Sequence, residues 1–336
     1  MASDATGGRP RRITALDVAR RAGVSRSAVS RAFSRTAYID PGKRALILKV
    51  AEEMGYRPNA LAAGLMRTRS NLVAVVAGEI GNFHDAALVA QLVPALIAAG
   101  KWPIVIDGSV DAEDLGTPDI FSYPLDAMIV RGGSVDETLV AACAKLNIPL
   151  VFSGCIVEAD FVDSVCCLNA GGMGMAADLL VQRGRRRFGY IGGPSSWASE
   201  RERFAGARAR LRAAGLEFVA CLSADYTFEG GSRAARDLLS AQQLDAVICA
   251  NDAMALGALT VARQEMGLAV PVDLSITGFD DIGQASWPCF NLTTLRNPVD
   301  TMVARIVDLL LTRLADPTLP GRVAYIEPDL IARDTH

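Results

Sequence analysis

The feature that most constrains the fold is an alternation of short apolar runs with helical patterns, which starts near residue 71. The runs mostly end in glycine or an acidic residue and cover 72–78, 102–108, 127–133, 149–154, 164–169, 187–193, 246–252 and 274–280. Helical patterns lie between most of them, as at 134–147, 171–184, 200–214, 229–241 and 252–267. Such repeats predict an α/β fold with parallel sheets covered by helices on both faces. Ligands then bind beyond the carboxyl ends of the strands.

The first 69 residues differ from the rest in charge. They hold 14 Lys and Arg against five Asp and Glu, a net charge of +9, whereas the whole chain carries −3. A basic N-terminal region on an acidic body is typical of proteins that bind nucleic acid through that region. The alternative, a solvated tail, would explain the run of charge but not the ordered pattern within it. We expect residues 1–12 to form a disordered basic tail.

Within this region, the stretch LDVARRAGVSRSAVSRAF (16–33) has the pattern of two short helices joined by a tight turn. Ala19 is small enough for the helices to approach, and Gly23 can adopt the left-handed backbone of the turn. The expected core consists of Val18, Ala22, Val24, Val29 and Phe33. A third helix over 41–56, with Leu46, Val50 and Met54 along one stripe, would complete an all-α helix-turn-helix domain at 13–57.

The second of these helices is suited to DNA. Ser25 is a natural N-cap, and the open N–H groups and dipole of the helix start suit a phosphate. The side chains that would enter the major groove lie in the first turn and one turn later, and are Arg26, Ser27, Ala28 and Arg31. The alternative is an ordinary helical hairpin with a solvated basic face.

Residues 58–70 are predicted to form a hinge helix and linker. Pro58 ends the preceding helix, and Asn59 can cap a new one. The segment 60–66 is only about two turns long and contains Gly64, so it should fold only on a partner.

The run from Thr14 to Arg69 resembles the DNA-binding region of the lactose-repressor (LacI/GalR) family, through the DVA–AGVS–VSR spacing and the YRPN sequence at 56–59. The resemblance implies a homodimer on a pseudo-palindromic operator, with Leu65 wedged into the central base step from the minor groove. The alternative for Leu65 is a core position in a longer helix. The implied DNA-binding residues are Thr14, Ser25, Arg26, Ser27, Ala28, Arg31, Asn59 and Leu65.

Residues 71–336 resemble the two-lobed, periplasmic-binding-protein-like (type I) body of the same family. The matching motifs are RERFAG (201–206), DAVICANDAMALGAL (245–259), PVDLSITGFDDI (271–282) and LTTLRNP (292–298). The resemblance implies an effector-binding and dimerisation domain whose chain crosses three times between the lobes. Lobe 1 would hold about 71–155 and 285–315, and lobe 2 about 156–282 and 323–332.

The resemblance also implies effector-binding residues in lobe 2. Arg203, Asn251 and Asp280 match the family's ligand-binding arginine, asparagine and aspartate, and Tyr226 stands at a position often held by a pocket aromatic. These groups suit a small polar metabolite such as a sugar or sugar derivative, because they bind hydroxyls and cover a ring. Trp197 is a candidate for covering the second face of such a ring, and its alternative is an ordinary aromatic residue of a loop or of the core. The alternative for Arg203 is a structural salt bridge.

Lobe 1 departs from the family pattern. The sequence from Glu79 to His84 lacks the proline of the family's acid-x-x-Asn-Pro-Phe-Phe motif, and the stretch 100–126 is shorter than expected. Glu79, Phe83 and His84 are nevertheless candidate effector-binding residues. For His84, a surface position at a helix start is an equal alternative.

Enzymatic readings are weaker. GGMGMAA (171–177) contains a dinucleotide-like glycine pattern, but the next strand ends without the required acid, so a tight strand-to-helix turn is favoured. Asp280 and Asp281 are neighbours on a strand and should point apart. The chain has only two histidines and no CxxC among seven cysteines. We therefore expect no catalytic triad, metal site or cofactor.

The remaining expectations concern location and assembly. No signal peptide is recognisable, and the longest apolar run, 86–100, is too short to span a bilayer, so we expect a cytoplasmic protein with no membrane partner. That run is a reasonable dimer surface, and the absence of a heptad tail favours a dimer over a tetramer. The prediction is thus a repressor-type transcription regulator. The runner-up is a sugar-binding protein without DNA activity.

Overall fold

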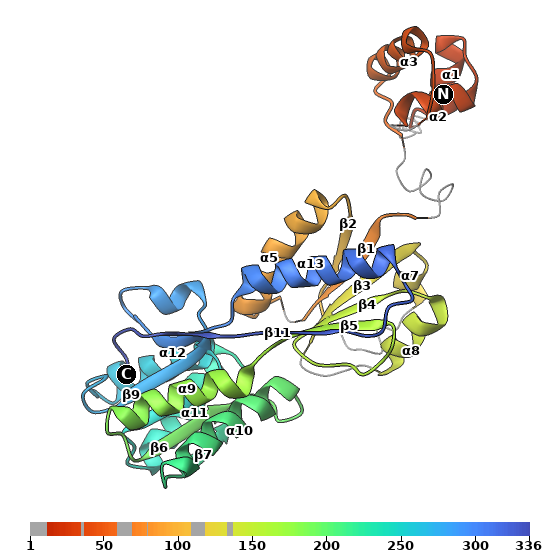
Figure 1. Ribbon diagram of the computed structural model, residues 1–336. Coiled ribbons are helices and arrows are strands. Elements are labelled where there is room, and N and C mark those ends of the chain that lie inside the picture. The colour runs from red at the N-terminus through yellow and green to blue at the C-terminus, as the bar shows by residue number, and fades with distance from the viewer. Residues whose placement is uncertain (1–11, 35–36, 59–68, 79, 109–117, 133–136) are drawn as a thin grey trace, which may run out of the picture. The chain divides into compact units, whose positions relative to one another are not determined.

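The structure is a computed structural model that describes residues 12–34, 37–58, 69–78, 80–108, 118–132 and 137–336 (Figure 1). The chain divides into two compact units, residues 1–70 and 71–336. Three of the candidate site residues, Asn59, Leu65 and Glu79, lie outside the described residues.

The small unit contains three helices, α1 (Ala15–Ala22), α2 (Arg26–Phe33) and α3 (Pro41–Glu53). Thr14 begins α1 with a capping box, in which its side chain accepts from the Asp17 N–H while Asp17 accepts from the Thr14 N–H. Ser25 caps α2 as the sequence predicts, and Gly23 has a φ of +66° in the turn between the helices. The predicted helix–turn–helix is therefore confirmed.

The core of this unit differs from the prediction in one stripe. Val18 and Val29 are buried as expected, but α3 buries Ile47, Val50 and Ala51, whereas Leu46 is 47% exposed. Val50 of the predicted stripe is buried and Met54 packs against the core, so only Leu46 was placed wrongly. Adjacent residues on a helix point about 100° apart, and Ile47 takes the buried position instead. The stripe at i, i+3 and i+4 is the one that faces α1 and α2.

The large unit contains two six-stranded sheets. The first has the order β11-β5-β4-β3-β1-β2 and is parallel throughout. Its strands are β1 (Leu72–Ala77), β2 (Trp102–Ile106), β3 (Leu125–Arg131), β4 (Leu150–Ser153), β5 (Val162–Cys167) and β11 (Val323–Ile326). We call this sheet and its helices lobe 1.

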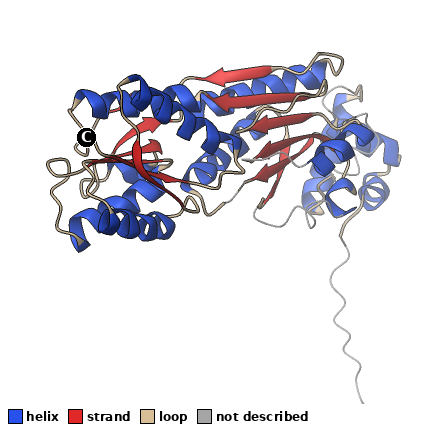
Figure 2. Ribbon diagram, turned by 90° about the horizontal axis from the view of Figure 1, so that it is seen from below, coloured by secondary structure: helices blue, strands red, loops and turns tan. Residues whose placement is uncertain are grey.

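The second sheet has the order β12-β10-β9-β8-β6-β7, in which β12 alone runs antiparallel to its neighbour. Its strands are β6 (Phe188–Gly192), β7 (Phe218–Ser223), β8 (Ala246–Cys249), β9 (Ser275–Asp280), β10 (Thr293–Arg296) and β12 (Asp329–Ile331). This sheet and its helices form lobe 2. Figure 2 shows the strands of the two sheets among the helices that cover them.

In lobe 1, helices cover both faces of the sheet. Side chains of β1 alternate, so Val73 and Val75 face α5 (Phe83–Ala98) and α13 (Val299–Ala315), which pack together. Ala74 and Val76 face the opposite layer, which includes α7 (Pro118–Phe121) and α8 (Glu137–Leu146). This alternation is the expected pattern for a parallel strand buried on both faces.

In lobe 2, the helices pack as two close pairs, α9 (Asn169–Gln182) with α10 (Ala198–Ala213) and α11 (Phe228–Ala241) with α12 (Asp252–Thr260). A π-helical turn, Val261–Glu265, continues α12, and a 3₁₀ turn at Gly283–Ser286 follows β9. The glycines of GGMGMAA lie inside α9, so the tight turn expected there is wrong. Helices α9 and α10 pack closely enough to require small residues where they meet, because a Cβ at Gly206 of α10 would lie 2.1 Å from the carbonyl oxygen of Ala170 in α9.

The chain passes between the lobes three times, after β5, after β10 and between β11 and β12. These positions correct the predicted lobe boundaries. The expected division placed 162–167 and 323–326 in lobe 2 and 293–296 in lobe 1, yet β5 pairs with β4, β11 with β5, and β10 with β9. The run at β5 is buried along its whole length and adds to the first sheet, which apolar patterning alone could not reveal.

Within the described part of the chain, no helix is both long enough and apolar enough to cross a membrane. The apolar run predicted at 86–100 forms most of α5, which starts three residues earlier, at Phe83, and accommodates Pro94 inside the helix.

Candidate functional site

The first candidate site is the start of α2. Ser25 Oγ accepts from the Ala28 N–H at 3.2 Å and also lies 2.9 Å from Ser27 Oγ. The side chains of Arg26, Ser27 and Arg31 are exposed, whereas Ala28 is half-buried against the core of the small unit. The helix therefore presents two arginines and two serines to solvent at and near its N-terminus.

Thr14, the remaining described candidate of this group, is exposed at the start of α1. Its hydroxyl donates to Asp17 Oδ2 at 2.6 Å, so the capping box holds the side chain in place.

The second candidate site lies between the lobes, where Arg203 of α10 is 95% buried. Its Nε donates to Asn169 Oδ1 at 3.0 Å, its Nη1 to the Ala250 carbonyl at 2.7 Å and its Nη2 to Asp280 Oδ1 at 3.2 Å. The guanidinium also lies over the Phe279 ring, 3.9 Å from the centroid. Burial disfavours the charge on Arg203, but the Asp280 carboxylate, together with smaller contributions from neighbouring groups such as Glu200, raises the pKa of Arg203. The cation is thus permanent.

Asp280 ends β9 and Asp281 follows it, with φ values of +111° and +54°. Both are left-handed, which is unusual outside glycine and costly unless neighbours fix the backbone. The Asp281 carboxylate forms ion pairs with Arg296 Nε, 2.8 Å from Oδ2, and with Arg333 Nη2, 2.6 Å from Oδ1. Asp280 pairs instead with Arg203. The two carboxylates therefore serve different partners, and they point apart as the sequence predicts, although through a left-handed backbone and not an extended one.

A hydrogen-bonded group around Glu200 holds Tyr226 in the site. The Glu200 carboxylate accepts from the Tyr226 and Tyr190 hydroxyls, each at 2.8 Å, and from the Gly193 N–H at 2.9 Å. A Cβ at Gly193 would lie 2.2 Å from the Tyr226 ring, so only glycine leaves room for it. Burial raises the pKa of Tyr226, which keeps its hydroxyl neutral. The Trp197 ring stacks on Tyr226 at 5.1 Å between centroids.

Asn251 is 97% buried at the N-terminus of α12. Its Oδ1 caps the helix by accepting from the Met254 N–H at 3.0 Å, and its Nδ2 donates to the Tyr226 carbonyl at 3.1 Å. Both ends of the amide thus bind the protein, and Asn251 joins α12 to the aromatic side of the site.

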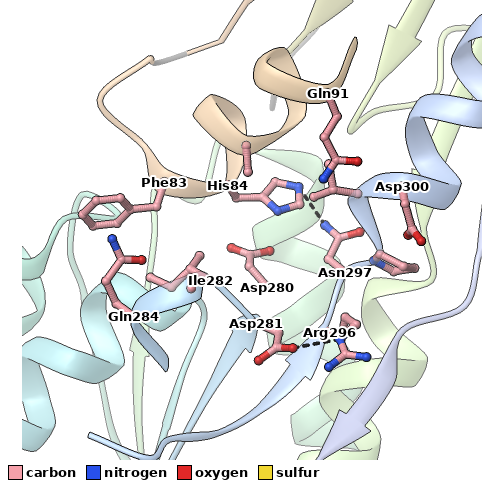
Figure 3. A pocket seen from close by; sticks show the side chains of 14 residues that line it. Phe83, His84, Gln91, Asp280, Asp281, Ile282, Gln284, Arg296, Asn297 and Asp300 are labelled. Atoms are coloured by element: carbon pink, nitrogen blue, oxygen red, sulfur yellow. Dashed lines mark hydrogen bonds and ion pairs between the residues drawn. The ribbon is translucent and has the colours of Figure 1, made fainter. Parts of the chain in front are cut away.

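Lobe 1 contributes His84 from the first turn of α5. His84 is only 3% exposed, so the alternative of a surface position is wrong. Its Nε2 lies 3.2 Å from Nδ2 of Asn297, the residue that follows β10, as Figure 3 shows. Burial, opposed in part by Asp280, lowers the pKa of His84, so the ring is neutral at neutral pH.

Sequence reasoning missed an ion pair in lobe 1. Arg131 at the end of β3 donates through Nε to Asp85 Oδ1 at 2.7 Å and through Nη1 to the Ser153 carbonyl at 3.1 Å. Arg131 ends one of the recognised apolar runs, so its position at a strand end was a usable signal. Asp85 follows the atypical Glu79–His84 segment, where no motif indicated it.

These side chains line two neighbouring cavities that share His84 and Asp280. A small cavity of about 30 Å³ is lined by Asn82, His84, Asp85, Arg131, Trp197, Ser199, Arg203, Tyr226, Asn251 and Asp280. A larger one of about 580 Å³ is lined by residues of α5, the 280–284 loop and the 296–300 segment, including Phe83 (Figure 3). All five lobe 2 candidates thus meet at one place, and two lobe 1 candidates, Phe83 and His84, lie beside them.

Among the described residues, no group of three or more His, Cys, Asp and Glu side chains is placed to bind a metal ion. A DNA-binding helix–turn–helix unit joined to a two-lobed unit with a polar cavity between its lobes defines the class of this chain. It is a DNA-binding transcriptional regulator with a ligand-binding domain.

Comparison with known proteins gives the family. Residues 14–59 match the model of bacterial regulatory proteins of the lacI family, and residues 177–336 match the periplasmic binding protein-like domain. The chain is 31% identical over 339 residues to the HTH-type transcriptional regulator CelR of Thermobifida fusca, covering 97% of this chain and 99% of that protein. The chain belongs to the lacI family of bacterial regulatory proteins.

Solved structures agree with this assignment. The lac repressor dimer bound to operator and the anti-inducer ONPF matches with a TM-score of 0.86 and 25% identity, over 97% of this chain and 99% of that one. A complex of the transcriptional regulator CelR with cellobiose matches with a TM-score of 0.73 and 29% identity, over 97% of this chain and all of that one.

Proposed function

We propose that this regulator binds a pseudo-palindromic operator as a homodimer and represses transcription in the cytoplasm. In this proposal a sugar or sugar derivative binds between the lobes and controls DNA binding. The observation that carries it is the convergence of Arg203, Asp280 and Tyr226 on one buried polar cavity, in a chain whose other unit is a capped helix–turn–helix.

For DNA, the support is the exposed start of α2. Arg26 and Arg31 can donate paired hydrogen bonds to guanine edges or bind phosphates, and the open N–H groups behind the Ser25 cap suit a phosphate. In the proposal, Thr14 and Ser25 position the domain on the backbone, while Asn59 and Leu65 belong to a hinge over 58–70. Support for the dimer comes from the lac repressor, whose structure is that of a dimer bound to operator.

For the effector, the support is chemical. A carboxylate beside a guanidinium binds adjacent hydroxyls, and an aromatic ring covers the apolar face of a sugar. The CelR structure, which contains cellobiose, shows that a sugar is a ligand of one relative. The cavity at Arg203, about 30 Å³, is far smaller than typical ligand pockets of about 300–1,000 Å³. We infer that ligand entry requires the lobes to separate, which couples binding to a change of shape.

The test is a selection of genomic fragments by the full-length protein, followed by mobility shifts at several salt concentrations. We expect a salt-sensitive preference for a few fragments over random DNA. Arg26→Ala should weaken binding to those fragments by about 1–3 kcal/mol, while Arg208→Ala, a charge-matched change on the exposed surface of α10, should not. Protein that prefers no fragment, with or without cell metabolites, contradicts the proposal.

A further inference from the structure

The two lobes each present a carboxylate–guanidinium pair to the same small cavity. Lobe 2 contributes Arg203 and Asp280, 3.2 Å apart, and lobe 1 contributes Arg131 and Asp85, 2.7 Å apart. The lobe 2 pair belongs to recognised family motifs, whereas Asp85 and Arg131 belong to no recognised motif and each follows a segment where this chain departs from the family pattern. The lobe 1 pair therefore carries information about this chain in particular.

The lobe 1 pair is built into the surrounding backbone. A Cβ at Gly78 would lie 2.5 Å from Asp85 Oδ2, and one at Gly154 would lie 2.0 Å from Arg131 Nη1. Both glycines follow strands, have positive φ and leave the space that the ion pair occupies. Asp85 also lies in the first turn of α5, where the helix dipole favours a negative charge.

The chemistry of such a pair selects hydroxyl groups. A carboxylate only accepts hydrogen bonds and a guanidinium only donates them, so two adjacent hydroxyls, one donating and one accepting, satisfy both. With one pair on each lobe, a ligand held between them needs hydroxyl pairs at two opposite edges.

The same arrangement disfavours a charged ligand. Each arginine is already neutralised by its own carboxylate, so a ligand carboxylate or phosphate would bring an uncompensated charge into a buried site, which is costly. A flat apolar ligand is also a poor match, because most of the residues that line the cavity are polar or charged.

We propose that Asp85 and Arg131 are effector-binding residues, and that the effector is an uncharged polyhydroxy compound of the aldose type with hydroxyl pairs at opposite edges. This inference rests on the proposed function and narrows it, since it excludes sugar acids, sugar phosphates and nucleobases.

The test is calorimetric titration of the full-length protein with three aldoses, D-glucose, D-galactose and D-mannose, and with the three matching uronates. The tightest ligand of the wild-type protein should be an aldose, and its uronate should bind at least about tenfold more weakly. A uronate that binds more tightly than its aldose overturns the inference while leaving the proposed sugar site intact.

Two variants then test the lobe 1 pair directly. Asp85→Asn removes the carboxylate charge and leaves Arg131 unpaired, so it should weaken aldose binding about tenfold or more and strengthen binding of the uronate. Arg131→Met should weaken aldose binding without any gain for the uronate. Asp178→Asn, which breaks the exposed Asp178–Arg210 pair of lobe 2, is the matched control and should change neither affinity.

Melting of each variant without sugar checks that it folds, and the two variants are independent should one of them not fold. Aldose affinity unchanged in both Asp85→Asn and Arg131→Met overturns the inference. If none of the six sugars binds the wild-type protein, the inference is overturned. The proposed function, which also covers larger sugars and sugar derivatives, and operator binding are unaffected by that result.

Discussion

The two lobes bring the same kind of ion pair to the cleft, but they build it in opposite ways. In lobe 2 the arginine comes from a helix, α10, and the aspartate from the end of a strand, β9. In lobe 1 the aspartate comes from the first turn of a helix, α5, and the arginine from the end of a strand, β3. The comparison teaches that a helix and a strand end can each supply either member of the ion pair, so two different local sequences can bring the same chemistry to one cleft.

The pairs also differ in depth. The Arg203 and Asp280 side chains are 6% and 7% exposed, against 17% and 10% for Arg131 and Asp85. Arg203 additionally contacts the Phe279 ring, whereas Asp85 has the helix N-terminus to stabilise its charge. The stability of lobe 2 should therefore depend more strongly on its ion pair than the stability of lobe 1 does.

The largest expected effect is a loss of stability when the more deeply buried pair, Arg203 and Asp280, is broken. Arg203→Met leaves Asp280 buried without its cation and should lower the free energy of unfolding by about 3–5 kcal/mol. Arg131→Met should cost less, about 1–3 kcal/mol, because Asp85 keeps the helix dipole. Urea unfolding followed by tryptophan fluorescence measures this, since Trp102, Trp197 and Trp287 all lie in the large unit. Equal losses in the two variants would refute the difference in depth.

A smaller effect concerns the space behind the lobe 1 pair. Gly154→Ala places a Cβ against Arg131 and should destabilise the large unit by about 1–3 kcal/mol more than Gly100→Ala. Gly100 has a φ of +75° but no heavy atom within 4 Å of its would-be Cβ, so it controls for the backbone conformation alone. Similar losses for both alanine variants in the same urea assay would show that the pair tolerates displacement.

The smallest effect concerns His84, where the lobes meet. Burial lowers its pKa, so the unfolded chain binds more protons than the folded one below the ordinary histidine pKa of about 6.5. The stabilisation that neutral His84 provides is thus present above that pH and is lost as the pH falls, at no more than about 1.4 kcal/mol per pH unit. His84→Gln should flatten unfolding free energy against pH between pH 7 and 5. His336, whose pKa is also lowered by burial, is present in both proteins, so the difference between their slopes reports on His84 alone. A slope unchanged by His84→Gln would contradict the assignment.

The sequence predicts those parts of the fold in which the local residue types decide the structure. The turn at Gly23, the cap at Ser25 and most strands of the two sheets follow from residue type and spacing. The stripe on α3 shows the limit, since apolar residues at 46 and 47 allow two faces and tertiary packing selects one. The strand β5 shows another limit, because a run that is buried along its whole length does not reveal which sheet it joins.

The residues of the cleft also fall into those that the sequence predicted and those that it did not. Arg203, Asn251 and Asp280 lie in motifs long enough to recognise, and the structure brings them together. Asp85 and Arg131 are separated by 46 positions in the sequence and lie in no motif, so only the fold reveals that they meet. The hydrogen bond from Tyr226 to Glu200 could not be predicted either, because the two residues are far apart in the sequence and Glu200 lies in no recognised motif.

The three passages of the chain between the lobes have a consequence for biosynthesis. Neither sheet is complete until β11 and β12 have been made, and Thr335, which is fully buried, hydrogen-bonds to the backbone of Ile276 and Thr293. During translation neither lobe can therefore reach its final form until residues 323–335 have left the ribosome. A premature stop codon upstream of these residues would remove an edge strand from both lobes at once.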